Sequence, residues 1–410
     1  MLKYRNLYFK SPTLKDYYFL FKKNSSEISL KSFFIQNYKC LNVYTFMSAR
    51  SGIYFLLKTL NFERNSEVIV CGFTCEVVPA AIIYANLTPK YIDIDFNTLS
   101  IDKELFFQND FSKVKAIIIQ HTFGISGIDF SIINFCKEKN IFIIEDCSLA
   151  IFSEYNGNSL GIFGDASVFS FEISKSINSV RGGVVIINSN LNILRDNNID
   201  FNYKIIPKLN CIKKFQLLIQ LFLNYLLYND NIYILTRYIL FILYKFNFFR
   251  KSTLSSEYYV LKPNDYLRKM PFFIEKFIFS QLQRSVEFKF KNQFIHKFYL
   301  DNITNFFNYP TRINNSNYLI RFPILVQNKH ELIDIFKQHG YEIGSWFDSP
   351  LASRNLNFDH FKLKLDELPR SSFIAKHIIN LPMHHRIKKN DLFDIINLLK
   401  KHGKNVEFKN

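Results

Sequence analysis

The sequence predicts an α/β fold built on a mostly parallel sheet. Between about residues 45 and 190, short and mostly unbroken apolar runs alternate with stretches of helical spacing. Unbroken runs are typical of strands that are buried on both faces of a parallel sheet. The runs are residues 68–70, 91–94, 116–119, 141–144 and 184–187, and the clearest helical stretches between them are 53–60 and 130–137.

A second, smaller lobe is expected after residue 285. A chain of 410 residues is too long for one simple core and fits two packed lobes. The pattern predicts a strand over 319–326, a helix over 329–339 and a terminal amphipathic helix over 391–401, with Asn390 as its N-cap. The expected division is an N-terminal extension at 1–45, a large domain at 46–203, an apolar two-helix insert at 204–264, and a connecting helix with a small C-terminal α+β domain at 265–410.

The insert consists of two apolar stretches, 215–228 and 232–249. In the first, Gln216, Gln220 and Asn224 form one polar stripe, which predicts an amphipathic helix with a wide apolar face. At 1.5 Å per residue it spans about 21 Å, less than the roughly 30 Å of a hydrocarbon core, so it is not expected to cross a membrane.

The sequence is compatible with two locations for the insert. The basic pairs Lys213-Lys214 and Arg250-Lys251 flank it, and they suit contact between residues 211–251 and anionic headgroups at the cytoplasmic face of a membrane. A hairpin buried in a dimer interface, or against the body of the protein, is the alternative.

Composition and charge exclude some classes of protein and favour others. An apolar content of 48% excludes a disordered chain, and the net charge of +17 favours an acidic partner such as a nucleotide, a phosphorylated substrate or an anionic membrane. The sequence has no helix-turn-helix, zinc-finger or RNA-binding signature, so nucleic acid is not expected. The six cysteines lack the spacing of a metal site, and the N-terminus lacks the apolar core of a signal peptide, which favours a reducing cytoplasm.

One pair of side chains indicates a specific chemistry. Asp146 follows the apolar run 141–144, and Lys175 follows Ser170 by five residues in a segment that leads to Gly182-Gly183. A pyridoxal-phosphate enzyme needs a lysine that holds the cofactor aldehyde as a Schiff base and a carboxylate that keeps the pyridine nitrogen protonated. Lys175 and Asp146 fit these two requirements.

Ordered motifs around this pair resemble the DegT/StrS-type sugar aminotransferases, over about residues 45–200 and 265–405. The resemblance implies the aspartate-aminotransferase fold (fold type I), with pyridoxal phosphate as cofactor. The motifs are Ser51-Gly52-Ile53, Phe73-Thr74-Cys75, Ile92-Asp93-Ile94-Asp95, His121-Thr122-Phe123-Gly124, Glu145-Asp146-Cys147-Ser148-Leu149, Gly164-Asp165, Phe169-Ser170-Phe171, Lys175, Gly182-Gly183 and Leu381-Pro382-Met383-His384.

The resemblance also implies roles. Lys175 would bind the cofactor and shuttle the proton, and Asp146 would pair with the pyridinium nitrogen. Ser51, Gly52 and Ile53 would begin a helix whose free N–H groups bind the phosphate. Ser170 would add a hydroxyl to the same phosphate.

Three positions depart from the family pattern. Ile53 stands where a threonine hydroxyl usually helps to bind phosphate, and Cys75 where an aromatic ring usually stacks on the pyridine. Leu149 replaces a glutamine that usually reaches the phenolic oxygen of the ring, and leucine cannot donate a hydrogen bond. These changes affect the surroundings of the cofactor and leave the lysine and the aspartate in place.

The function implied by the resemblance is transfer of an amino group, from glutamate, to a keto-sugar linked to a nucleotide. Such enzymes serve the synthesis of cell-surface polysaccharide or lipopolysaccharide, and the family implies a homodimer. A catalytically weakened relative that acts as a ligand-binding or membrane-associated scaffold, and another pyridoxal-phosphate reaction on a sugar, remain as alternatives.

Overall fold

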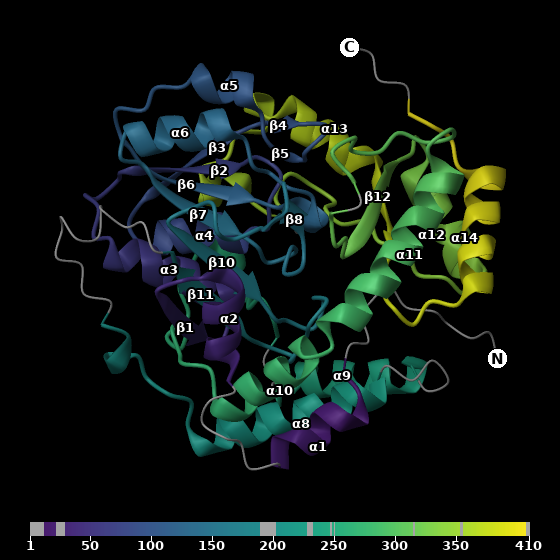
Figure 1. Cartoon of the computed structure of the whole chain (residues 1–410), viewed down its shortest axis with the longest axis horizontal. Helices are drawn as coiled ribbons and strands as arrows, with labels where there is room; N and C mark the ends of the chain where they lie inside the picture. The colour runs from purple at the N-terminus through teal and green to yellow at the C-terminus, as the bar shows by residue number, and fades with distance from the viewer. Residues whose placement is uncertain are drawn as a thin grey trace.

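The structure is a computed structural model of the chain. It describes residues 12–21, 29–188, 202–227, 233–246, 248–249, 251–314, 316–352 and 356–406. A seven-stranded sheet forms the centre of the larger domain, in the order β1-β11-β10-β7-β6-β2-β3 (Figure 1). Its strands are β1 (Asn42–Phe46), β2 (Glu67–Cys71), β3 (Thr88–Ile92), β6 (Val114–Gln120), β7 (Phe142–Asp146), β10 (Ala166–Ser170) and β11 (Gly183–Ile187).

The predicted α/β class and the mostly parallel sheet are confirmed. Strands β3, β2, β6, β7 and β10 pair in parallel, whereas β11 runs antiparallel to both β10 and β1. Four of the five predicted runs lie in this sheet, and the run 91–94 is divided: residues 91–92 end β3, whereas Ile94 begins β4 of a separate two-stranded sheet. Strand β1 was not predicted, and β10 was predicted only as a motif and not as a strand of the sheet.

Side chains of the central strands enter two separate cores, which explains the unbroken apolar runs. Val68 and Val70 of β2 join one apolar cluster, whereas Ile69 between them joins the other. Helices α3 (Ala49–Thr59) and α4 (Val77–Tyr84) cover the first face, and α6 (Phe130–Glu138) belongs to the second. A strand that is buried on both faces has no position where water would favour a polar residue.

The small domain has the predicted α+β character. Strands β12 (Arg321–Leu325) and β13 (Ile378–Pro382) pair antiparallel. The last helix begins at Lys389, so the prediction of Asn390 as its N-cap is wrong: the cap is Lys388, whose N–H donates to Asp391 Oδ2 at 3.2 Å. The helices of this domain are α11 (Ser285–Ile303), α12 (Lys329–Gln338), α13 (Pro369–His377) and α14 (Lys389–His402).

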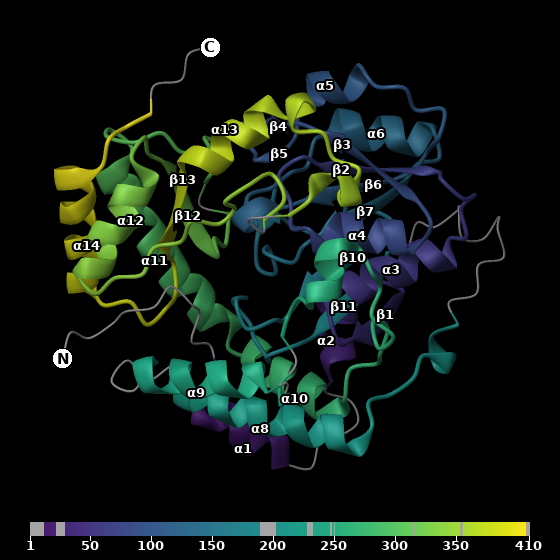
Figure 2. The same ribbon diagram turned by 180° about the vertical axis from the view of Figure 1, so that it is seen from behind.

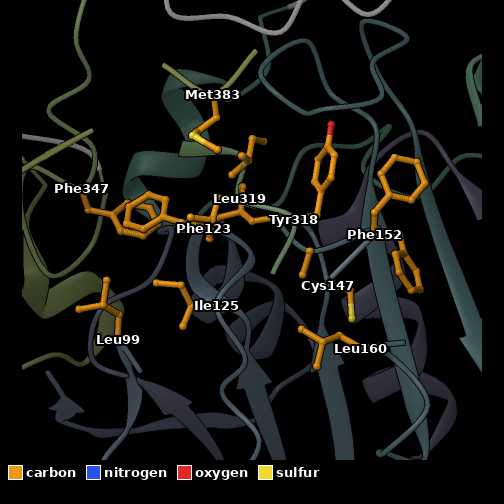
Figure 3. Close-up of a cluster of buried hydrophobic side chains, with 14 of the residues drawn as sticks. Leu99, Phe123, Ile125, Cys147, Phe152, Leu160, Tyr318, Leu319, Phe347 and Met383 are labelled. Carbon is orange, nitrogen blue, oxygen red and sulfur yellow. The ribbon is translucent and has the colours of Figure 1, made fainter. Parts of the chain in front are cut away.

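One apolar core continues from the large domain into the small one. Figure 3 shows Leu99, Phe123 and Ile125 of the large domain beside Leu319, Met383 and Phe347 from the second half of the chain. The rings of Phe123 and Phe347 stack with their centroids 6.0 Å apart. This shared core fixes the small domain over the carboxyl ends of the parallel strands.

Helices form one end of the molecule, which lies at the bottom of Figure 1. Helix α10 (Phe272–Leu282) packs with α1 (Leu14–Phe21), and α8 (Cys211–Leu227) packs with α9 (Tyr233–Lys245). The Tyr17 hydroxyl of α1 donates to the carbonyl of Leu221 in α8 at 2.9 Å. Among the described residues, no helix is both long enough and apolar enough to span a bilayer.

Shorter elements complete the chain. Helix α2 (Leu30–Tyr38) precedes β1, and α5 (Lys103–Phe107) precedes β6. The remaining pieces are the two-residue strands β4 (Ile94–Asp95), β5 (Ser100–Ile101), β8 (Glu154–Tyr155) and β9 (Asn158–Ser159), and the 3-10 helices at Thr122–Gly124, Tyr203–Ile205, Ser255–Tyr259, Phe358–Phe361 and Leu365–Glu367.

Candidate active site

A cavity of about 270 Å³ lies at the carboxyl ends of the parallel strands. Six of the residues singled out in the sequence line it together, although most of them are far apart in the chain: Ile53, Cys75, Asp146, Leu149, Ser170 and Lys175. Open α/β sheets place their ligands at this edge. The cavity is close to the lower limit of about 300 Å³ for small-molecule sites.

Asp146 is the last residue of β7 and is buried. Its Oδ1 accepts a hydrogen bond from the N–H of Ser148 at 2.9 Å, which orients the carboxylate at the strand end. The neighbouring strand β6 ends in register, with Gln120 opposite Asp146. The sheet therefore sets both the depth and the direction of this acid.

His121 and Glu145 form a buried network next to Asp146. The N–H of Gly127 donates to His121 Nδ1 at 3.1 Å, so Nε2–H is the donor to Glu145 Oε2 at 3.0 Å. Glu145 also accepts the N–H groups of Gly161, Phe163 and Gly164, at 2.8, 2.7 and 2.7 Å. The ligand atoms of Cys147, His121 and Glu145 are close enough to one another for a metal site. Hydrogen bonds already engage both Glu145 oxygens, however, so these residues hold the loops around the cavity in place.

Lys175 lies half-buried on the turn after β10, where its backbone N–H donates to the carbonyl of Glu172 at 2.9 Å. Burial lowers the pKa of its amine, and the negative groups Glu172 and Asp146 oppose this shift only in part. A lowered pKa increases the fraction of neutral amine, which is the nucleophilic form. Its Nζ lies 5.5 Å from the ring centroid of Trp346, which the small domain contributes.

The start of α3 differs from the expectation. The helix begins at Ala49, because Ser48 is the N-cap and its Oγ accepts the N–H of Ser51 at 3.4 Å. Ser51 is then inside the first turn, and its hydroxyl donates to the carbonyl of Tyr266 at 2.6 Å. A Cβ added to Gly52 would lie 2.5 Å from Val185 Cγ2, so Gly52 serves the packing of α3 on the sheet.

Ser51 and Gly52 therefore do not line the cavity. The positions of α3 that do so are Ala49, Arg50 and Ile53. Ala49 and Arg50 are the first two residues of the helix, where backbone N–H groups have no intrahelical acceptor and attract anions. Ser170, at the end of β10, also lines the cavity.

Arg50 is a site residue that the sequence analysis missed. Its Nη1 lies 2.9 Å from Glu257 Oε1, and its Nη2 lies 3.5 Å from Glu172 Oε1. Burial favours loss of the Arg50 charge, but the two carboxylates outweigh it and raise the pKa of the guanidinium. Burial likewise acts to raise the pKa of Glu172, and the Arg50 charge keeps that pKa below its usual value.

The segment after α9 completes this side of the cavity. Ser252 and Thr253 line it, and the Ser252 hydroxyl donates to Glu172 Oε2. Arg50 donates to Ser252 Oγ at 3.3 Å and to Thr253 Oγ1 at 3.4 Å. These partners are about 200 positions from Arg50 in the chain, so no local motif could reveal them.

The residues present fit pyridoxal phosphate. An amine, a carboxylate, a hydroxyl and a helix N-terminus line one cavity, which is the donor set that the aldehyde, the ring nitrogen and the phosphate require. The three unusual positions line it too, so Ile53, Cys75 and Leu149 change the immediate surroundings of the group. Burial raises the pKa of the Cys75 thiol, which stays protonated beside Glu76.

Comparison with protein families gives one match that covers more than half of the chain. The model of the DegT/DnrJ/EryC1/StrS aminotransferase family matches residues 30–195 and 276–400. A curated relative, the GDP-perosamine synthase of Escherichia coli O157:H7, is 35% identical over 137 residues, which is 33% of this chain and 38% of the relative. The chain thus spans about two fifths of the length of that relative.

Comparison with solved structures covers almost the whole chain. The aminotransferase PseC of Helicobacter pylori, involved in the biosynthesis of pseudoaminic acid, has a TM-score of 0.70 at 17% identity, over 97% of this chain and 98% of that one. The GDP-4-keto-6-deoxy-D-mannose-3-dehydratase of E. coli, with bound hydrated PLP, has a TM-score of 0.69 at 15% identity, over 97% and 100%. At these identities the likeness shows the fold alone.

Proposed function

The chain belongs to the DegT/DnrJ/EryC1/StrS aminotransferase family, as its motifs predict, and we propose that it transfers an amino group to a keto-sugar. The amino donor is glutamate, and the keto-sugar is linked to a nucleotide and serves cell-surface polysaccharide or lipopolysaccharide. The cofactor is pyridoxal phosphate. The observation that carries the proposal is that Lys175 and Asp146 line one cavity at the carboxyl end of a parallel sheet.

Each residue has a part in this reaction. When bound, pyridoxal phosphate supplies an aldehyde that captures amines and a pyridinium ring that accepts electrons. Lys175 would hold the cofactor through Nζ. After its release, the same atom would carry the proton that moves between the substrate carbon and the cofactor carbon. Asp146 keeps a proton on the ring nitrogen. Trp346 and Phe347 exclude water on the side of the small domain, because both line the cavity.

Lysine at position 175 supports amino transfer over dehydration. Some members of the family that this chain resembles carry histidine in place of the lysine and act as dehydratases. The dehydratase fold is very similar to this one, so the fold does not separate the two reactions. The side chain at position 175 does.

Absorbance and product release together test the proposal. Wild-type protein with added pyridoxal phosphate should show the visible band of cofactor joined to a lysine, and Lys175→Ala should abolish the band. Lys139→Ala, which changes an exposed lysine, should keep it. With glutamate and a nucleotide-linked keto-sugar, wild type should release 2-oxoglutarate.

Two outcomes would favour the alternatives. Absence of the band in wild type would indicate a family relative that binds a ligand or acts as a scaffold. A normal band without release of 2-oxoglutarate, over a panel of keto-sugars, would indicate another pyridoxal-phosphate reaction.

Assembly and location form the last part of the proposal. Family membership supports a homodimer, in which the partner chain completes each site. The net charge of +17 and the basic pairs of the insert support a cytoplasmic enzyme at the inner face of the membrane.

A further inference from the structure

The two-helix insert is folded with its polar stripe inward. On α8, Gln220 and Asn224 are 4% and 5% exposed, whereas Phe215 and Leu226 are 63% and 50% exposed. A helix on a water-facing surface has the opposite arrangement. The outward positions Ile212, Phe215, Phe222 and Leu226 follow the three-and-four spacing of one helix face, so the apolar stripe is continuous.

Helices α1 and α9 also expose large apolar side chains. On α1, Leu14, Tyr18 and Phe21 are exposed at a helical spacing, while Asp16 is buried. On α9, Leu235, Tyr238 and Phe241 are exposed. Figures 1 and 2 show all three helices at the same end of the molecule, below the sheet. We call the exposed apolar side chains of α1, α8 and α9 the apolar face.

Polar contacts fix the inward orientation of Gln220 and Asp16. Gln220 Nε2 donates to the Tyr244 hydroxyl of α9 at 2.8 Å. Asp16 accepts from Ser280 Oγ at 2.8 Å and pairs with Arg284 at 2.5 Å, which ties α1 to the helices behind it. A rotation that hid the phenylalanines would break these buried bonds, and each break costs about 1–3 kcal/mol. The exposure of the apolar stripes is thus built into the fold.

The charges near the apolar face select its partner. The three helices carry Lys15, Lys213, Lys214 and Lys245, and Asp16 is the one acid among their described residues. Asp16 is buried and Lys213 pairs with Asp265 at 3.2 Å, so the outward charge of the described side chains of these helices comes from Lys15, Lys214 and Lys245 and is positive. A second copy of the chain would bring lysines against lysines. An anionic phospholipid surface attracts them, and it accepts large aromatic side chains at its headgroup boundary.

We propose that the apolar face docks on an anionic bilayer, with α1, α8 and α9 in the plane of the headgroups. Helix α8 has 17 residues and is about 26 Å long, so it lies on the surface rather than crossing it. The proposal rests on the proposed function only for the location at the inner membrane face. Arg250, which the sequence analysis placed beside Lys251 in the basic flank, lies outside the described residues.

Vesicle flotation of the full-length protein tests the docking. The protein should float with vesicles of phosphatidylglycerol and phosphatidylcholine, and much less with phosphatidylcholine alone. Added salt should weaken the binding because it screens the lysines. The variant Phe215→Ser/Phe222→Ser should lower partitioning by about tenfold for each phenylalanine. Phe107→Ser, an exposed phenylalanine on α5 at the opposite end of the molecule, should leave it unchanged.

The outcomes separate this proposal from the enzymatic one. Absence of flotation with anionic vesicles, or equal flotation of wild type and the double variant, would overturn the docking. A halved molar mass of the double variant in light scattering would also overturn it, because the apolar face would then join two copies. Lys175→Ala should float like wild type, so loss of catalysis and loss of docking are scored independently. The visible cofactor band of the double variant checks that it is folded.

Discussion

Two walls of the cofactor cavity are held in different ways. The sheet wall carries Asp146 and Ser170 at the ends of β7 and β10, and hydrogen bonds inside the domain fix it. The second wall carries Arg50, which pairs with both Glu172 and Glu257, and Glu172, which accepts a hydrogen bond from Ser252 of the segment after α9. The first wall depends on secondary structure, and the second on buried charges from distant parts of the chain.

The second wall is also where this protein departs from its family. The family model leaves out residues 196–275, and the partners Ser252 and Glu257 lie in that gap. The segment that follows the apolar helices therefore provides one wall of the cavity. A change in the insert can reach the cofactor through this wall, whereas the sheet wall is shared with the family.

The largest expected effect falls on the charged wall. Arg50→Gln leaves the buried Glu257 without the cation that it pairs with and removes the strongest of the positive charges that act on Glu172, and removal of one partner of a buried pair costs about 3 kcal/mol or more. Urea denaturation of the variant should show this loss, and the titrated affinity for pyridoxal phosphate should fall as well. Arg50→Lys keeps the charge and should lose less. Equal stability of wild type and Arg50→Gln would mean that the two walls do not differ in the way described.

The effect expected on the sheet wall concerns rate rather than stability. Asp146→Ala removes the acid that keeps the ring nitrogen protonated, and kcat should fall on the order of 10²-fold to 10³-fold. The melting temperature should change little, because the hydrogen bonds of Glu145 and His121 remain. Asp110→Ala, a substitution of an acid that is exposed, is the matched control. Normal turnover by Asp146→Ala would remove Asp146 from the mechanism.

The smallest expected effect is a pH dependence of stability, and it comes from Lys175. Its pKa is lowered by burial, so above that pKa, and up to the ordinary value of 10.5, the unfolded chain binds more protons than the folded one. Stability of the cofactor-free protein should therefore gain from this group as pH rises through that window. Lys175→Met should remove the gain. Burial raises the pKa of tyrosines such as Tyr266 and Tyr299, and these groups change stability with pH in both proteins. The difference between the two profiles of unfolding free energy against pH, measured with urea, therefore isolates Lys175. Identical profiles would contradict the lowered pKa.

Sequence reasoning succeeded where burial and local spacing determine the structure. Four of the five apolar runs, and the first half of the run 91–94, became strands of the central sheet because both faces of that sheet are covered. Asp146 and Lys175 were found because a strand end and a turn next to it are local features. Their roles in the reaction stay predictions.

Other features depend on distant contacts that no local pattern contains. Ser51 was expected at the start of α3, but Ser48 caps the helix one turn earlier. The stripe of Gln216, Gln220 and Asn224 was visible, yet its inward direction depends on Tyr244 and on the packing of α1. Arg50 gave no signal because its partners are about 200 residues away.

The side chain that faces Lys175 across the cavity gives the protein an optical probe of its own. Trp346 is the one tryptophan in the chain, and it lies in the small domain, 5.5 Å from Lys175 Nζ. All indole emission therefore originates beside the site where the cofactor is expected. Energy transfer to a bound chromophore would quench this emission. Unlabelled protein can thus report loading of the site in real time.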